Sequence, residues 1–247
     1  MSAALGLLSP VAIGVVIPTL DEVARLPRLL SRLLGADVDA PDRADEVVVA
    51  DGGSGDATGA LAREHGARVV AAPRGRGAQL AAGAECVTAD VLLFLHADCV
   101  PEPGALAVLR RAFADPVLDA TAMRQRIAAP GAFYRLVEAA ANARSRRGMV
   151  LGDSGLAVRR DLYHALGGFR SIGMFEDVEL SRRLRRRCRV RYLAEARLSV
   201  SARRWQHEGA LRCTMRNWVL RALYGAGVGP ERLARFYPPH PPTPGTS

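Results

Sequence analysis

Polar residues that could do chemistry follow the apolar runs of this chain rather than interrupting them. His96 and Asp98 come directly after one apolar run, and Asp51 follows another. Glu176 and Asp177 open a stretch with helical spacing. An aspartate beside an imidazole can hold a divalent cation that bridges phosphate oxygens. A positioned carboxylate can also remove a proton as a general base. These residue types indicate phosphate chemistry combined with proton transfer.

Two glycine-rich stretches extend this pattern. Residues 51–56 read Asp-Gly-Gly-Ser-Gly-Asp, and the glycines allow close approach of backbone to a ligand. An aspartate at a strand end can accept a hydrogen bond from a nucleobase N–H. Further on, Arg74 and Arg76 flank Gly75 and offer forked donors to a diphosphate. Neither stretch completes G-x-G-x-x-G, which argues against a dinucleotide dehydrogenase.

Each signal also has a plainer interpretation when taken alone. Asp98 could cap a helix, and residues 51–56 could form only a turn. Acidic residues in the first turn of a helix are favoured by its dipole regardless of function. The arginines that follow Asp177 are typical of a solvated helix face. The functional interpretation therefore depends on the motifs occurring together.

Composition excludes several classes of protein. The 247 residues carry a formal charge of +9, and all 34 basic residues are arginine. Without lysine there is no Walker-A phosphate loop, no Schiff-base enzyme and no serine–lysine hydrolase. The four cysteines form no C-x-x-C pair, which argues against a zinc ribbon and favours a reducing, cytoplasmic setting. The basic balance suits an anionic ligand.

The elements that must position these residues alternate between strand and helix. We expect buried strands at 11–17, 46–50, 67–71 and 91–95, with helices at 21–34, 58–65 and 78–86 between them. Later helices are expected at 102–113, 133–144, 161–166, 176–187 and 211–224, with a short strand at 156–158. Alternation of this kind predicts an α/β fold with a doubly wound, mostly parallel sheet. Ligands bind beyond the carboxyl ends of such strands, where the polar clusters fall.

Taken together, the motifs resemble the family 2 glycosyltransferases, over residues 11–207. Six stretches match the family pattern in order, namely 17–22, 51–58, 74–83, 95–98, 167–169 and 176–184. The resemblance implies a GT-A fold and an inverting enzyme that moves a sugar from a nucleoside diphosphate to a hydroxyl or carboxyl acceptor, one that could be lipid-like. More narrowly, Leu-His-Ala-Asp at 95–98 and Ser-Ala-Arg-Arg-Trp at 201–205 resemble a small bacterial subgroup. Some of its members carry a diaponeurosporenoate glycosyltransferase label.

On the donor side, the resemblance implies roles at matching positions. Pro18, Thr19 and Glu22 would border the nucleoside of a nucleotide-sugar, with a UDP-sugar favoured. Asp51 would bind the base, beside Gly53.

At the reaction centre, the resemblance assigns Arg76 to base or phosphate contact and Asp98 to a divalent cation, Mn²⁺ or Mg²⁺. His96 stands where the family has its first acidic metal-motif residue, and could bind ribose instead. Asp177 matches the base that deprotonates the acceptor.

On the acceptor side, Glu176 and Trp205 would contact the acceptor. Arg204 would lie near the diphosphate. Ser201 stands where the family pattern has a glutamine, so this segment departs from the pattern.

Domain organisation follows from the same resemblance. We expect a GT-A domain at 1–207, a C-terminal amphipathic helical extension at 208–237 and a disordered proline-rich tail at 238–247. The extension carries three arginines beside Trp218, as a helix lying on the inner face of the cell membrane would. More often, a helix of this kind simply packs on its own domain.

Two rival functions remain open at this stage. A nucleotidyltransferase would share the nucleotide-binding fold but release pyrophosphate. A basic nucleic-acid or lipid-surface binding module would use the arginines alone. Few aromatic residues are interleaved with the arginines at 182–191, so we expect no nucleic-acid partner.

Overall fold

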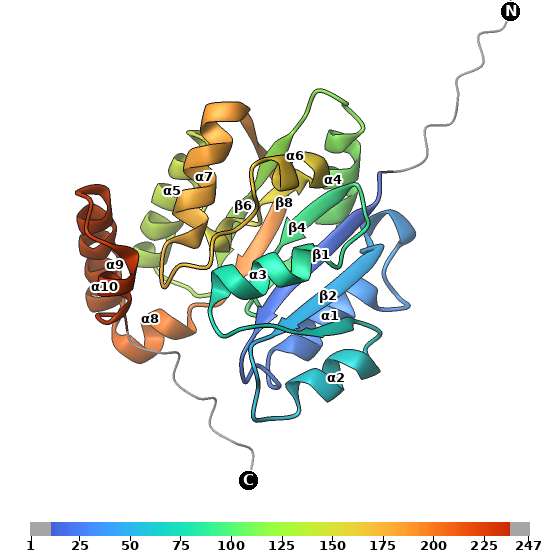
Figure 1. The fold of residues 1–247 in the computed structure, drawn as a ribbon, viewed down its shortest axis with the longest axis horizontal. Coiled ribbons are helices and arrows are strands. Elements are labelled where there is room, and N and C mark those ends of the chain that lie inside the picture. The colour runs from blue at the N-terminus through green and yellow to red at the C-terminus, as the bar shows by residue number, and fades with distance from the viewer. Residues whose placement is uncertain (1–10, 238–247) are drawn as a thin grey trace, which may run out of the picture.

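Residues 11–237 are described by the computed structural model, and they form an eight-stranded sheet covered by helices on both faces (Figure 1). The predicted tail at 238–247 lies outside the described residues. The strands are β1 (Ile13–Thr19), β2 (Glu46–Asp51), β3 (Arg68–Ala71), β4 (Val91–Phe94), β5 (Cys99–Pro101), β6 (Ala120–Ile127), β7 (Ala157–Arg159) and β8 (Val190–Val200). Their order in the sheet is β3-β2-β1-β4-β7-β6-β8-β5.

The first half of the sheet is parallel, as the alternating pattern predicts. β1 pairs in parallel with β2 and with β4, and β2 pairs in parallel with β3. The helices that make these crossovers are α1 (Leu26–Leu34), α2 (Thr58–Glu64) and α3 (Arg76–Ala84). All seven residues of β1 are buried, because helices cover both of its faces.

The second half of the sheet is mixed. β7 runs antiparallel to both β4 and β6, β6 runs parallel to β8, and β5 closes the edge antiparallel to β8. The helices of this half are α4 (Ala105–Phe113), α5 (Ala132–Arg146), α6 (Arg160–Ala165) and α7 (Glu176–Arg187). The GT-A arrangement of a mostly parallel sheet, predicted above, is confirmed.

The core has two layers because β1 alternates its side chains between the two faces. Val15 and Ile17 pack with the buried leucines of α1 and α4, whereas Val16 packs with Leu80 of α3. Gly83 on α3 lets this helix approach closely, since a Cβ there would lie 2.5 Å from Cγ1 of Val16.

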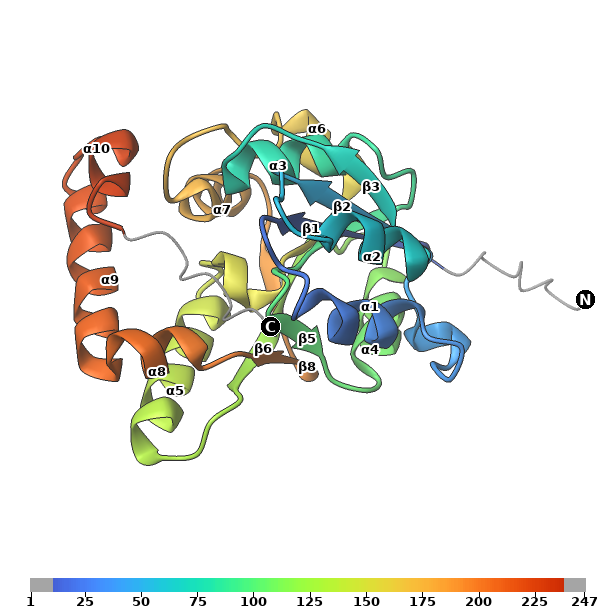
Figure 2. The same cartoon turned by 90° about the horizontal axis from the view of Figure 1, so that it is seen from below.

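Three further helices follow the sheet, and they lie together at one end of the molecule (Figures 1 and 2). These are α8 (Arg203–Glu208), α9 (Ala210–Gly225) and α10 (Pro230–Ala234). The expected domain boundary at residue 207 falls inside α8. A third apolar cluster joins Phe175 and Val178, at the start of α7, to Leu220 of α9 and Leu233 of α10. Among residues 11–237, no helix is both long and apolar enough to cross a membrane.

Candidate active site

The carboxyl ends of β1 and β2 are held together by one buried side chain. Gln79 of α3 is 5% exposed, and its Nε2 donates to the carbonyl oxygens of Thr19, at 2.7 Å, and Ala50, at 3.0 Å. Thr19 is the last residue of β1 and Ala50 the last but one of β2, so both carbonyls lie directly before the two predicted donor loops. Gln79 therefore fixes the relative position of Pro18, Thr19 and the loop that follows Asp51.

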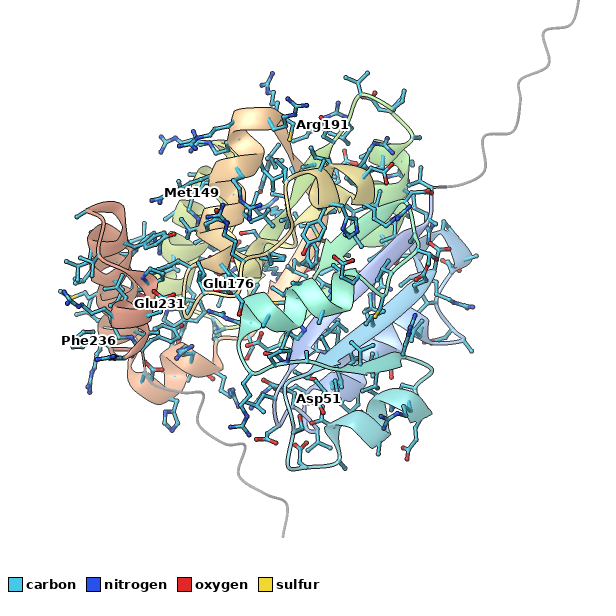
Figure 3. All side chains as sticks on the ribbon, viewed as in Figure 1. Asp51, Met149, Glu176, Arg191, Glu231 and Phe236 are labelled. Carbon is cyan, nitrogen blue, oxygen red and sulfur yellow. The ribbon has the colours of Figure 1, made fainter. Side chains whose placement is uncertain are left out.

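The loop after β2 is closed largely by its own side chains. Oδ1 of Asp51 accepts hydrogen bonds from the Ser54 amide at 3.0 Å and from the Ser54 hydroxyl at 2.5 Å. The Gly55 amide donates to Oδ1 of Asp21 at 2.7 Å, which ties this loop to the one after β1. Gly53 adopts a φ of 85°, a conformation that favours glycine. Asp51, the predicted base-binding residue, therefore also shapes the loop (Figure 3).

Glu22 lies between this loop and the predicted metal position. Its amide donates to Oγ1 of Thr58 at 2.9 Å, and its carboxylate pairs with Arg25. Burial raises the pKa of Glu22, and Arg25 opposes that shift. The charge of Asp98 raises the pKa of Glu22 further, which places the two carboxyl groups in one electrostatic neighbourhood.

Asp98 follows β4 in a half-buried position. Burial raises its pKa, while the Cys99 thiol, 3.6 Å from Oδ1, and the charge of Arg25 lower it. The nearby carboxylate of Asp153 acts in the raising direction. A cation placed here would stabilise a carboxylate that burial otherwise disfavours.

A single carboxylate, that of Asp98, fits a cation that takes its other ligands from a bound diphosphate. Within the described part of the chain, no group of three or more His, Cys, Asp and Glu side chains could hold a metal ion by itself. Mg²⁺ sites commonly use only one or two carboxylates and take further ligands from substrate phosphates. Asp98 can supply that single protein ligand, as the sequence predicts.

The amino end of α7 presents the predicted base. The Gly152 amide donates to Oδ2 of Asp177 at 2.7 Å, and the Val178 amide donates to Oδ1 at 2.6 Å. The helix dipole also favours a carboxylate at this end. These two hydrogen bonds hold the Asp177 carboxyl group in one orientation.

Asp177 and His96 line the same small cavity. Gly152 and Glu176 also line it, but most of its lining is apolar and includes Phe94 and Phe169. The His96 imidazole packs directly on Gly152, since a Cβ at that glycine would lie 2.3 Å from Nε2. The structure thus brings His96, after β4, and Asp177, in the first turn of α7, to one cavity, although they are 81 residues apart in the sequence.

Arg76 completes the charged centre from the amino end of α3. Its Nε lies 3.1 Å from Oε1 of Glu176, which is 3% exposed. The pKa of Arg76 is raised first by Glu176, and also by Asp177 and Asp98. Burial raises the pKa of Glu176 and Arg76 opposes that shift. A guanidinium at this point can contact a diphosphate bound at Asp98 while remaining beside the predicted base.

Arg204 and Trp205 lie on α8, outside this charged centre. Nε of Arg204 lies 2.9 Å from Oε1 of Glu208, and the guanidinium lies 4.0 Å from the ring centre of Tyr237. Charges of both Arg204 and Arg76 lower the pKa of Tyr237, against the raising effect of burial. Tyr237 therefore lies in the electrostatic reach of both arginines. Trp205 donates to Oγ1 of Thr214 on α9 at 3.1 Å.

Sequence reasoning missed four residues that the structure places at the site. They are Arg25, Gln79, Gly152 and Asp153. The last two fall in a Gly-Asp-Ser-Gly stretch at 152–155, which belongs to none of the six stretches that match the family pattern. Their position at the site is seen only in the structure, where the second half of the sheet brings this segment back to the carboxyl end of β4.

Comparison with protein families identifies the class of protein to which this fold belongs. The model of the family described as "Glycosyl transferase family 2" matches residues 14–178, which is more than half of the chain. The chain belongs to glycosyl transferase family 2. Comparison with curated protein sequences gave no match.

Solved structures show the same fold. A mannosyltransferase from Pyrobaculum calidifontis, in complex with GDP-Man and Mn²⁺, is 21% identical with a TM-score of 0.65 over 90% of this chain and 68% of its own. Glucosyl-3-phosphoglycerate synthase from Mycobacterium tuberculosis, with Mn²⁺, UDP and phosphoglyceric acid, is 24% identical with a TM-score of 0.54, over 76% and 69%. S. aureus TarS 1-349 is 18% identical with a TM-score of 0.62, over 77% of this chain. This chain spans 60% of the TarS fragment.

Proposed function

We propose that this glycosyltransferase transfers a sugar, with inversion at the anomeric carbon, from a nucleoside diphosphate to a hydroxyl or carboxyl acceptor. The observation that carries the proposal is the shared cavity of Asp177 and His96, next to Asp98 and Arg76. Asp177 and His96 line this cavity, and Arg76 lies within electrostatic reach of both Asp177 and Asp98. That is the arrangement a single displacement requires.

In the proposed reaction, an oxygen of the acceptor forms a bond to the anomeric carbon. The bond from that carbon to the diphosphate oxygen breaks at the opposite face, and the electron pair leaves with the nucleoside diphosphate. Asp177 takes the acceptor proton as attack proceeds. The two amides that bind Asp177 keep its carboxylate aimed into the cavity.

The leaving diphosphate gains negative charge, and Arg76 is positioned to stabilise it. Asp98 is the residue that would hold Mn²⁺ or Mg²⁺, which when bound would offset the same charge. The related structures that contain GDP-Man with Mn²⁺, or UDP with Mn²⁺, support this arrangement. Of the nucleotides, we favour a UDP-sugar as donor, with Asp51 and the loop at 52–56 at the base.

Product analysis tests the proposal against a nucleotidyltransferase. The purified chain is incubated with UDP-, GDP- and TDP-sugars and Mn²⁺, and the released products are separated by ion-exchange chromatography. Release of a nucleoside diphosphate in step with loss of the donor supports sugar transfer or donor hydrolysis at this site. A nucleotidyltransferase would instead act on a nucleoside triphosphate and a sugar 1-phosphate. Release of pyrophosphate in a parallel incubation with those two substrates, or of a nucleoside monophosphate from the nucleotide-sugar, would contradict the proposal.

A further inference from the structure

Helix α9 has two apolar faces, and only one of them is covered. Cys213 and Leu220 are buried against the rest of the protein, at 1% and 4% exposure. On the same side, Tyr224 stacks on Phe175 with 4.9 Å between ring centres. These contacts fix the helix on the domain and determine which side faces outward.

The outward side carries a continuous apolar stripe, which we call the outer stripe. Its members are large, exposed and spaced so that they fall on one side of a helix: Leu211 at 67%, Met215 at 56%, Trp218 at 62%, Val219 at 55% and Leu223 at 41%. At about 100° per residue, the centre of this stripe lies roughly opposite Cys213 and Leu220. The stripe is therefore a second surface, independent of the packing of α9 on its own domain.

The surroundings of the outer stripe are strongly basic. Between residues 209 and 237 the chain has one acidic residue, Glu231, and five arginines at 212, 216, 221, 232 and 235. Arg216 is paired with Glu208 of α8, and Arg221 lies within reach of the charges of Asp153 and Asp177, whereas Arg212, Arg232 and Arg235 are exposed. On the neighbouring helix α7, the guanidinium of Arg182 lies 4.8 Å from the ring centre of Tyr224. Phe236, 67% exposed, lies at the same end of the molecule as α9 and α10 (Figure 3).

We propose that the outer stripe of α9 docks the protein on an anionic lipid bilayer. Trp218 and its apolar neighbours enter the boundary between headgroups and acyl chains, while the flanking arginines contact lipid phosphates. Charge complementarity selects this partner. A second copy of the chain would bring two arginine-rich surfaces together, whereas an anionic bilayer neutralises one.

The test uses sedimentation with lipid vesicles. We expect the chain to sediment with phosphatidylcholine vesicles that contain phosphatidylglycerol and to stay in solution with pure phosphatidylcholine. Added salt should weaken the binding, because the attraction is partly electrostatic. Trp218 fluorescence should shift to shorter wavelength when the anionic vesicles are added.

Two sets of variants separate the stripe from the general charge. The double variant Trp218→Ser with Val219→Ser should lower vesicle affinity by about tenfold or more, because it removes apolar area from the docking face. The variant Val117→Ser removes an apolar side chain that is 84% exposed on another part of the surface, and should bind as the parent does. Both variants should keep the parent's affinity for nucleotide-sugar. A failure of the membrane proposal, measured as vesicle binding, is therefore distinct from a failure of the proposed function.

Three outcomes would overturn the proposal. The first is no sedimentation with anionic vesicles. The second is equal sedimentation of the parent and the Trp218/Val219 variant, which would assign binding to charge alone. The third is a parent that runs as a dimer, does not bind vesicles and becomes a monomer in the same variant, which would make the outer stripe a contact between copies.

Discussion

Neighbouring carboxylates at this site differ through their surroundings rather than their type. Asp177 is held by two backbone amides. Glu176, one residue earlier, is buried against Arg76, and burial raises its pKa. Asp98 is half-buried and lies near Asp153 and Arg25. One carboxylate is therefore suited to accept a proton, one to hold an arginine and one to hold a cation.

The raised pKa of Glu176 predicts a pH dependence of stability. A carboxyl group with a raised folded-state pKa binds its proton more tightly in the folded protein, so its contribution favours folding at low pH. That contribution is lost as the pH rises from about the ordinary value of 4.5 through the raised value. We expect the free energy of unfolding of Glu176→Gln to fall less steeply with rising pH over this range than that of the parent.

Urea unfolding at a series of pH values measures this effect. The variant Glu64→Gln, at an exposed position on α2, serves as the control and should keep the slope of the parent. If Glu176→Gln leaves the slope unchanged, the buried carboxyl does not titrate in the way its surroundings imply.

Because His96 packs directly on Gly152, we expect that adding one methyl group at position 152 lowers the catalytic rate. In Gly152→Ala, a Cβ would overlap Nε2 of His96 and displace either the imidazole or the amide that orients Asp177. Since misplacement by about 1 Å can cost roughly 10²-fold in rate, we expect a loss of kcat of about that size.

The control is Gly225→Ala, at the end of α9, where a Cβ would meet nothing within 4 Å. Steady-state kinetics should show parent-like rates for this variant. Parent-like kcat in Gly152→Ala would show that the contact does not position the base.

Sequence alone identified residues whose role follows from a strand end or a helix start. Asp98 and Asp177 stand at such positions, and the family resemblance supplied their expected roles; both act electrostatically on Arg76. Arg25 and Gln79 gave no such signal, because their importance comes from partners 73 and 60 residues away (98 − 25 and 79 − 19). Such partners become neighbours only when the sheet is assembled.

At the scale of elements, the start of α7 depends on an unusual backbone conformation. Phe175 precedes the helix with a φ of 66°, which is rare for a residue that is not glycine. Its ring is stacked on Tyr224 of α9, at an interplanar angle of 24°. The C-terminal helix thus supports the conformation that directs Glu176 and Asp177 toward the cavity.

This support predicts coupling between α9 and the reaction. We expect Tyr224→Ala to lower kcat and to reduce the free energy of unfolding by about 1–3 kcal/mol, since it removes a stacked, partly buried ring. Tyr224→Phe keeps the ring and should behave as the parent. Thermal unfolding together with kinetics checks both expectations. A Tyr224→Ala enzyme of reduced stability but unchanged kcat would show that Phe175 keeps its conformation unaided.

Elements with a strong apolar period were predicted well, whereas elements with interleaved arginines were not. The four N-terminal strands and β7 were expected within two residues of their observed bounds. Strands β6 and β8 were missed, because exposed arginines alternate with their buried residues and hide the apolar run. The helix expected from residue 21 begins at Leu26, since Asp21, at a φ of 55°, and its neighbours form the donor loop instead.

At the scale of the whole molecule, the sheet order explains why distant motifs form one site. The carboxyl ends of β1, β2 and β4 meet in the parallel half, and β7 brings the segment at 150–155 beside β4. The parallel half alone predicted an α/β fold with a doubly wound sheet, and the family resemblance added the GT-A type. The site could not, because half of it comes from the mixed half of the sheet.

Donor binding should stabilise the whole fold. A ligand present at 100 times its Kd adds about 2.7 kcal/mol to the apparent free energy of unfolding. We expect a nucleotide-sugar to raise Tm more strongly with Mn²⁺ than without it, and Asp98→Asn to remove the part that depends on Mn²⁺. A thermal-shift series measures this. An Mn²⁺ effect that is the same in parent and variant would remove Asp98 as the metal ligand.

The measurement that tests the central claim most directly is turnover by Asp177→Asn. We expect kcat to fall by about 10²–10⁴-fold, as for loss of a positioned base, while the affinity for donor stays that of the parent. Asp161→Asn, an exposed aspartate in the first turn of α6, is the matched control and should retain full activity. Near-parental turnover by Asp177→Asn, under conditions in which Asp161→Asn is also fully active, would contradict the assignment of Asp177 as the base.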